Sequence, residues 1–216
     1  MKTFKQFLAE EAQSPFQKYM EEHCGDFLDQ SGRKDFLIRG MKKIDPSEWD
    51  TLKSSNVDGL PHYIPYHTLL MRTNRQPSDT SLATHEVINE WFRERFGWGA
   101  RSEVVFGEGR YNIAASSSSI DYGPTFIIFP VGDFKYVWSE DVSDLYRTLG
   151  AKMLDKPTMT DERKENIWKF LDSAEYRSTG LREALATYNS EIMIHCREYI
   201  AIPAAHAAVV RSELMA

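Results

Sequence analysis

Apolar residues recur along this chain with two spacings, one typical of helices and one typical of strands. Segments with apolar residues three and four positions apart are predicted to be helices: 14–28, 81–96, 141–149, 163–171 and 180–188. Short apolar runs between turn-forming residues are predicted to be strands: 36–40, 66–73, 101–107, 125–130, 134–139 and 192–202. Residues 131–133 predict a hairpin, and residues 44–65 predict a loop with one short helix near 47–52.

The mixture of helices and strands predicts an α+β fold. With 216 residues, of which 42% are hydrophobic, the chain is long enough to bury a sizeable core. Its length suits one large domain, or one domain with a small appendage.

Composition and charge narrow the classes of function. The net charge of −6 argues against a protein that holds nucleic acid through a general positive field. Cys24 and Cys196 lie far apart in the sequence, which indicates neither a disulfide framework nor a structural zinc site. No apolar run is long enough to cross a bilayer, so no membrane partner is expected.

Three polar residues stand at the ends of predicted strands. Arg39 ends the first strand and is followed by Gly40, Ser102 opens a middle strand, and Glu191 opens the last one. An arginine can bind a phosphate through two parallel hydrogen bonds, and a glycine lets a ligand approach the backbone. Taken singly, each residue is also compatible with an ordinary surface position at a strand end.

The order of these residues resembles the pattern of mono-ADP-ribosyltransferases. In that family a first strand ends in Arg-Gly, a middle strand opens with Ser, and a late aliphatic strand follows a Glu. Here the matching segments are residues 38–40, 101–103 and 189–191, and the resemblance covers residues 36–202. It implies a split β-core of two small packed sheets with surrounding helices.

The resemblance also implies roles for individual residues. NAD would be the substrate, with Glu191 as the catalytic carboxylate and with four residues on the NAD-binding side: Arg39, Gly40, Ser102 and Phe106. Asn189 would lie on the acceptor side, where related enzymes carry Glu or Gln. The acceptor, whether a host protein, a nucleic acid or a small molecule, is left open. Only the first serine of the family's Ser-Thr-Ser motif is present, so retention of activity is left open too.

The chemistry of NAD explains why such residues are needed. Cleavage of the bond between nicotinamide and ribose develops positive charge on the ribose, which a carboxylate such as Glu191 stabilises electrostatically. A guanidinium such as Arg39 pairs with the pyrophosphate. The hydroxyl of Ser102 is expected to orient the carboxylate.

The first twelve residues resemble the capsid-targeting peptides of internal head proteins in large tailed phages. The resemblance rests on the amphipathic pattern of the first residues and on the triplet Leu8-Ala9-Glu10. The resemblance implies cleavage after Glu10 by a prohead protease, packaging inside the capsid, and delivery within the virion to the host cytoplasm. The resemblance therefore implies a separate targeting segment at 1–12 and a single domain over residues 13–216, against which the segment would pack little.

Two other classes of function remain as alternatives. A non-catalytic phage virion or anti-defence binding protein would not require Arg39, Ser102 and Glu191 to meet. A hydrolase or nuclease could use a histidine, and the candidates are His67, His85 and His195. The histidines have no metal-ligand spacing, and the chain has no Gly-x-Gly-x-x-Gly motif for redox use of NAD.

Overall fold

A computed structural model describes most of the chain and confirms the α+β class. The described residues are 13–41, 64, 66–73, 75–77, 80–109, 124–150, 158–187 and 190–216. The expected targeting segment at 1–12 and Asn189 lie outside them, as does almost all of the predicted loop over 44–65.

Five strands form one sheet, which closes into a small barrel. They are β1 (Leu37–Gly40), β2 (His67–Leu70), β3 (Val105–Glu108), β4 (Thr125–Trp138) and β5 (Glu191–Pro203). Their order is β2-β5-β3-β1-β4, and a further pairing of β4 with β5 closes the ring. All pairings are antiparallel. The described strands thus form a single hydrogen-bonded sheet, whereas two small sheets were expected.

β5 lies at the centre of this arrangement because both of its edges are paired. Its first residues pair with β3, from Ile194 opposite Val105 to Glu191 opposite Glu108. Its later residues pair with β2, and β4 follows its other edge along almost the whole length. Most of its residues are buried, which agrees with the nearly continuous apolar run in the sequence.

The predicted hairpin over residues 125–139 is wrong. Both apolar runs belong to the single strand β4 and pair with β5 in the same direction, with one shift of register between Val131 and Phe134. Gly132 lies in this shift with φ of +66°, a conformation that glycine adopts without strain. A β-bulge bends the strand at this point, and the chain does not reverse direction.

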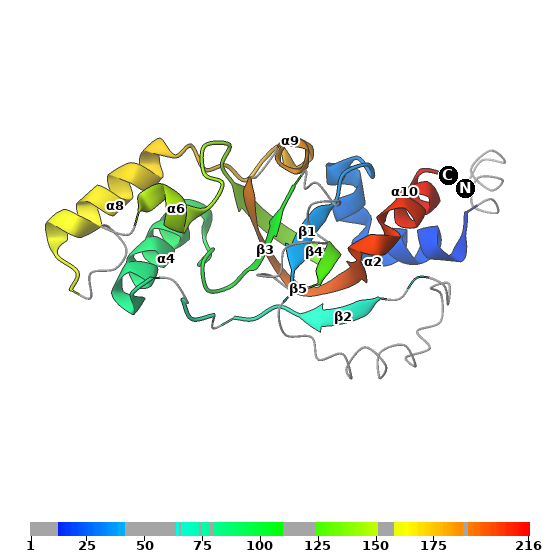
Figure 1. Ribbon diagram of the computed structural model, residues 1–216, viewed down its shortest axis with the longest axis horizontal. Helices are drawn as coiled ribbons and strands as arrows, with labels where there is room; N and C mark the ends of the chain where they lie inside the picture. The colour runs from blue at the N-terminus through cyan, green and yellow to red at the C-terminus, as the bar shows by residue number, and fades with distance from the viewer. Residues whose placement is uncertain are drawn as a thin grey trace.

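Helices cover both ends of the barrel (Figure 1). At one end lie α4 (Leu82–Phe96), α6 (Leu145–Leu149) and α8 (Asp161–Ser173), and at the other lie α2 (Pro15–Ser31) and α10 (Ala207–Met215). The short helix α9 (Leu181–Ala186) and a 3₁₀ turn (Ala204–His206) complete the described elements.

Local sequence signals explain the helix ends. Ser14 caps α2 with a capping box, and Ser81 caps α4 by accepting a hydrogen bond from the Thr84 amide. Gly32 and Gly97 end the same helices in the left-handed conformation. The predicted helices at 14–28 and 81–96 are therefore confirmed. The predicted helix at 141–149 is limited to α6, and α10 was not predicted.

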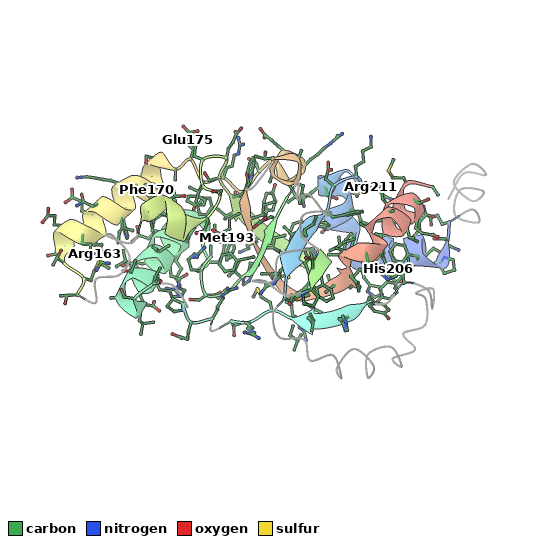
Figure 2. The ribbon with its side chains drawn as sticks, in the orientation of Figure 1. Arg163, Phe170, Glu175, Met193, His206 and Arg211 are labelled. Atoms are coloured by element: carbon green, nitrogen blue, oxygen red, sulfur yellow. The ribbon has the colours of Figure 1, made fainter. Side chains whose placement is uncertain are left out.

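The barrel separates two hydrophobic clusters. The larger one joins α2, α9 and α10 to the strands, and the smaller one joins α4, α6 and α8 to residues such as Val137 and Met193. Met193 of β5 belongs to the smaller cluster, whereas its neighbours Ile192 and Ile194 belong to the larger one. Figure 2 shows Met193 between the barrel and the α4–α8 helices. Alternate side chains of β5 thus face different cores.

Gly109, the residue after β3, lies close to the backbone of α9, and a substitution there tests how tightly the two elements pack. A Cβ atom added there would lie 2.5 Å from the Ala184 carbonyl oxygen and 2.7 Å from that of Leu185. Because a backbone must move to relieve this clash, Gly109→Ala should lower the free energy of unfolding by about 2 kcal/mol. Urea denaturation of the purified protein measures the change.

Gly25 provides the matched control for this substitution. It lies within α2, and an added Cβ would meet no atom within 4 Å. Gly25→Ala should leave the free energy of unfolding unchanged or raise it by about 0.5–1 kcal/mol. Equal stability of the two variants would contradict the close packing of β3 on α9.

Candidate functional site

A candidate site lies where β3 and the start of β5 face the α4–α8 helices. In the antiparallel pairing, Phe106 lies opposite Met193 and Glu108 lies opposite Glu191. Paired residues share a face of the sheet, and so do residues two positions apart. Phe106, Met193 and Glu191 therefore face the same side, toward the smaller hydrophobic cluster.

Glu191 is bound by an arginine. Nη1 of Arg101 donates to both carboxylate oxygens of Glu191, each at 3.0 Å. The two side chains expose 19% and 17% of their surface, so the pair is mostly but not fully withdrawn from solvent. Asn89 Oδ1 accepts a hydrogen bond from the Arg101 amide at 2.9 Å, which fixes the backbone of this arginine. Arg101 thus holds the candidate carboxylate in place.

The Phe106 ring carries two guanidinium groups. Cζ of Arg75 and Cζ of Arg101 each lie 4.5 Å from the ring centroid, within the range of cation–π attraction. Arg39 reaches the same residue from β1, because its Nη1 donates to the Phe106 carbonyl at 3.4 Å. Arg75 is also tied to the segment by its amide, which donates to the Ser102 carbonyl at 3.2 Å. Three arginines from separate parts of the chain therefore meet at one phenylalanine.

These arginines outnumber the acidic groups around them. Within the described residues, Glu191 is the one carboxylate in ion-pair distance of Arg39, Arg75 or Arg101. Burial, together with the Arg39 and Arg101 charges, lowers the pKa of Arg75 to about 10. Burial and Arg72 also lower the pKa of Arg39, although Tyr199 acts in the opposite direction. The cluster is an excess of positive charge in an acidic protein, which favours an anionic ligand.

Ser102 lies in a turn before β3 and does not open a strand, contrary to expectation. Its hydroxyl bonds to residues of α4, and Glu191 is not among its partners. Its hydroxyl lies 2.9 Å from His85 Nε2 and accepts a hydrogen bond from Asn89 Nδ2 at 2.6 Å. Both partners are buried. The hydroxyl therefore fixes the segment that carries Arg101, while Arg101 makes the contact to the carboxylate that was expected of Ser102.

Most of the predicted site residues come together. Arg39, Phe106, Ser102 and Glu191 are linked through the contacts described above, although their motifs are far apart in the sequence. Gly40 lies beside Arg39 and pairs with Thr125 of β4 at the end of β1.

Three further residues of the site were not predicted. Arg75 follows the predicted strand at 66–73, and Arg101 is the first residue of the predicted strand at 101–107. In the sequence, only their positive charge marks them as candidates. Tyr176 packs its ring against Phe92, with centroids 5.0 Å apart, and its buried hydroxyl has no hydrogen-bond partner among the described residues. Burial and, to a lesser extent, the Glu191 charge raise the pKa of Tyr176. The sequence gives no signal for this tyrosine.

The histidine candidates lie in separate environments. His85 contacts Ser102, His67 is buried in β2, and His195 Nδ1 lies 3.0 Å from the Glu103 carbonyl oxygen. Among the described residues, no group of three or more His, Cys, Asp or Glu side chains could hold a metal ion.

In the same described part of the chain, no helix is both long and apolar enough to cross a membrane.

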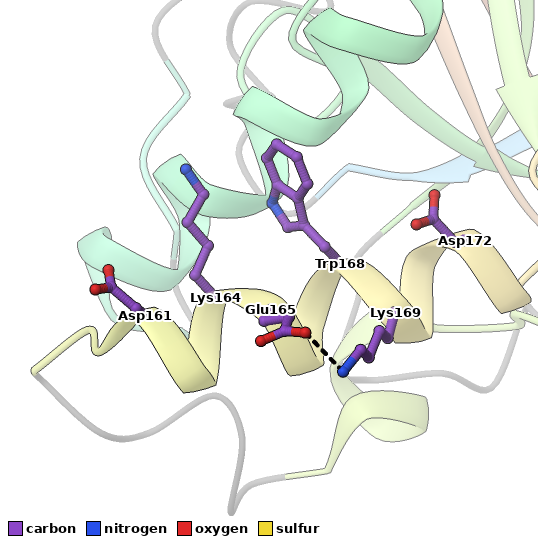
Figure 3. Close-up of a pocket in the computed structure, with 6 residues that line it drawn as sticks. All are labelled: Asp161, Lys164, Glu165, Trp168, Lys169 and Asp172. Atoms are coloured by element: carbon purple, nitrogen blue, oxygen red, sulfur yellow. Dashed lines mark ion pairs between the residues drawn. The ribbon is translucent and has the colours of Figure 1, made fainter.

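A shallow hollow lies along α8 (Figure 3). Its volume is about 350 Å³, and its lining residues are Asp161, Lys164, Glu165, Trp168, Lys169 and Asp172. Four of its five charged residues are paired: Lys169 with Glu165, Lys164 with Glu90, and Asp172 with Arg95. The Trp168 indole donates to the Val87 carbonyl, which fixes its ring. This hollow contains none of the arginines or the carboxylate described above.

Comparison with known proteins gave no match to a family model, to a curated protein or to a solved structure. The geometry of the arginine–glutamate cluster is therefore the basis for assigning a function.

His85 should make stability depend on pH. Burial and the Arg101 charge lower its pKa below the ordinary value of 6.5. Because the unfolded chain then takes up the proton more readily, the free energy of unfolding should fall as the pH drops from 6.5 toward the lowered pKa. His85→Gln removes this titration and keeps a polar group near Ser102.

Urea denaturation at about pH 7.5 and about pH 5.5 tests this expectation, because the interval spans the ordinary titration of histidine. The loss of stability on acidification should be smaller in His85→Gln than in the unchanged protein. His206→Gln, which alters a half-exposed histidine outside the site, should behave like the unchanged protein. An identical pH dependence in all three proteins would show that His85 is not held in its neutral form.

Proposed function

We propose that this protein is a mono-ADP-ribosyltransferase that moves ADP-ribose from NAD to a host macromolecule and releases nicotinamide. The observation that carries the proposal is the ion pair of Glu191 with Arg101, beside Arg75 on the Phe106 ring and Arg39 at the Phe106 carbonyl. A carboxylate within an excess of guanidinium groups suits a ligand that has a pyrophosphate beside a ribose that becomes positively charged. On this proposal the barrel and its helices correspond to the ADP-ribosyltransferase-like core.

The reaction needs one bond broken and one bond formed at the same carbon. The bond between ribose C1′ and the nicotinamide nitrogen breaks, and its electron pair leaves with neutral nicotinamide. A nucleophile of the acceptor then attacks C1′ and loses its proton. Glu191 stabilises the positive charge that develops on the ribose between these events.

The other residues of the site bind and orient. Arg39, which has no carboxylate partner among the described residues, pairs with a phosphate. Gly40 and Phe106 line the NAD side, and Ser102 holds the Arg101 segment through His85 and Asn89. On this proposal Asn189, next to Ser190 and Glu191, faces the acceptor.

The setting of the enzyme is part of the same proposal. The likeness of residues 1–12 to capsid-targeting peptides supports packaging in a phage head and action in the host cytoplasm. A host protein or a host nucleic acid would then be the acceptor, and the modification would serve host takeover.

The alternative is a non-catalytic phage virion or anti-defence binding protein. The Arg101–Glu191 ion pair is the observation that favours it, because a carboxylate neutralised by an arginine can serve structure alone.

Replacing the carboxylate by its amide tests the proposal. Glu191→Gln should keep the fold and bind NAD at least as tightly as the unchanged protein but lower transfer by about a hundredfold or more, because the amide carries no charge for the transition state. Arg39→Ala should weaken NAD binding as well, because a phosphate contact exists in the ground state. The measurement is transfer of labelled ADP-ribose from NAD to a host lysate, with calorimetry for NAD binding.

Treatment of the labelled lysate with protease, RNase or DNase then identifies the acceptor class. Loss of label with protease indicates a protein acceptor, and loss with a nuclease indicates RNA or DNA. Glu198→Gln is the matched control, because it removes a carboxylate from the part of β5 that pairs with β2, away from the Arg101 contact, and should transfer normally. Normal transfer by Glu191→Gln would exclude the proposed role of Glu191, and no transfer by the unchanged protein would favour the binding protein.

A further inference from the structure

The hydrogen bonding of Arg101 leaves most of its guanidinium available. Both oxygens of Glu191 bind the single nitrogen Nη1, and among the described residues Nε and Nη2 make no hydrogen bond. A fork-shaped pair, in which two nitrogens each bind one oxygen, is the stronger geometry for arginine and carboxylate. The Arg101–Glu191 contact therefore does not use the full binding capacity of the arginine.

Arg75 supplies a second guanidinium beside the first. It lies at the same distance from the Phe106 ring as Arg101, and in the described part of the chain it has no carboxylate partner. The proximity of the two charges contributes to the lowered pKa of Arg75. A ligand with two linked phosphates would place a negative charge beside each arginine and so reduce their repulsion. The Glu191 carboxylate neutralises Arg101 alone.

We propose that Arg75 and Arg101 form a binding pair for a pyrophosphate group, and that Glu191 competes with this group for Arg101. When the ligand binds, Arg101 turns from the carboxylate to a phosphate oxygen, and Glu191 becomes free. Arg101 is then the exchangeable counter-ion of Glu191. The catalytic meaning of this release depends on the proposed transferase function, whereas the competition itself does not.

The partial exposure of the pair makes the exchange physically reasonable. With 19% and 17% of their side-chain surface exposed, Arg101 and Glu191 can regain water on separating, which a fully buried pair could not do. The Arg101 backbone stays fixed by Asn89 and by the Ser102 contacts to α4, so that only the side chain needs to move. The exchange thus requires rotation of one side chain on a rigid segment.

If Glu191 competes with pyrophosphate for Arg101, removing the Glu191 charge should strengthen pyrophosphate binding. Inorganic pyrophosphate should bind Glu191→Gln about tenfold more tightly than the unchanged protein, because the competitor for Arg101 has lost its charge. Calorimetric titration at one fixed salt concentration measures this affinity. Glu103→Gln removes the same charge two residues from Arg101, but within the described residues its side chain makes no ion pair, and it should change affinity much less.

A double-mutant cycle separates competition from a general change of charge. In an Arg101→Ala background, pyrophosphate should bind weakly, and adding Glu191→Gln should no longer tighten binding. Arg101→Lys provides a variant that keeps the charge and the fold, and it should bind pyrophosphate less tightly because it lacks the planar fork. Arg75→Ala should weaken binding in every background.

Three results would overturn the inference: no binding of pyrophosphate to the unchanged protein, equal tightening by Glu191→Gln and Glu103→Gln, or tightening by Glu191→Gln that persists without Arg101. ADP-ribosyl transfer is measured separately on the same proteins. Transfer without competition would reject this inference and leave the proposed function standing. Competition without transfer would reject the proposed function and leave this anion exchange standing.

Discussion

The pairing of β5 along both edges is the constraint on which the rest of the structure depends. β4 follows one edge, and β3 and β2 share the other, so that this one strand joins both parts of the barrel. Its alternate side chains enter two different hydrophobic clusters. Because β5 is fixed on every side, Glu191 at its first residue has a defined position at the boundary between the clusters.

Phe106 is held in place by the same strand pairing and lies against the charged groups of the site. It lies opposite Met193 in the β3–β5 ladder and packs against the smaller hydrophobic cluster. The ring therefore offers a fixed surface to Arg75 and Arg101. Keeping like charges close together costs electrostatic energy, and the lowered pKa of Arg75 reflects this cost together with burial. Such a cost is common at binding sites, where a ligand of opposite charge offsets it.

Elements with a strong local signal were predictable from the sequence. The α4 helix follows from its apolar spacing, from the Ser81 cap and from Gly97 at its end. The bend of β4 was mistaken for a hairpin because Gly132 and Asp133 are typical of turns, and only the pairing with β5 distinguishes a bulge from a reversal. Tyr176 gave no signal, because its position depends on the packing of its ring on α4.

The sequence by itself determined the α+β class and the polar residues Arg39 and Glu191 at the ends of β1 and β5, because spacing and residue type are local properties. Only the tertiary structure decided which of these residues meet. Arg101 and Glu191 are separated by 90 residues, and their contact depends on the β3–β5 register. A shift of one residue would turn Glu191 toward the opposite core. Partners of this kind follow from long-range pairing, which local patterns do not encode.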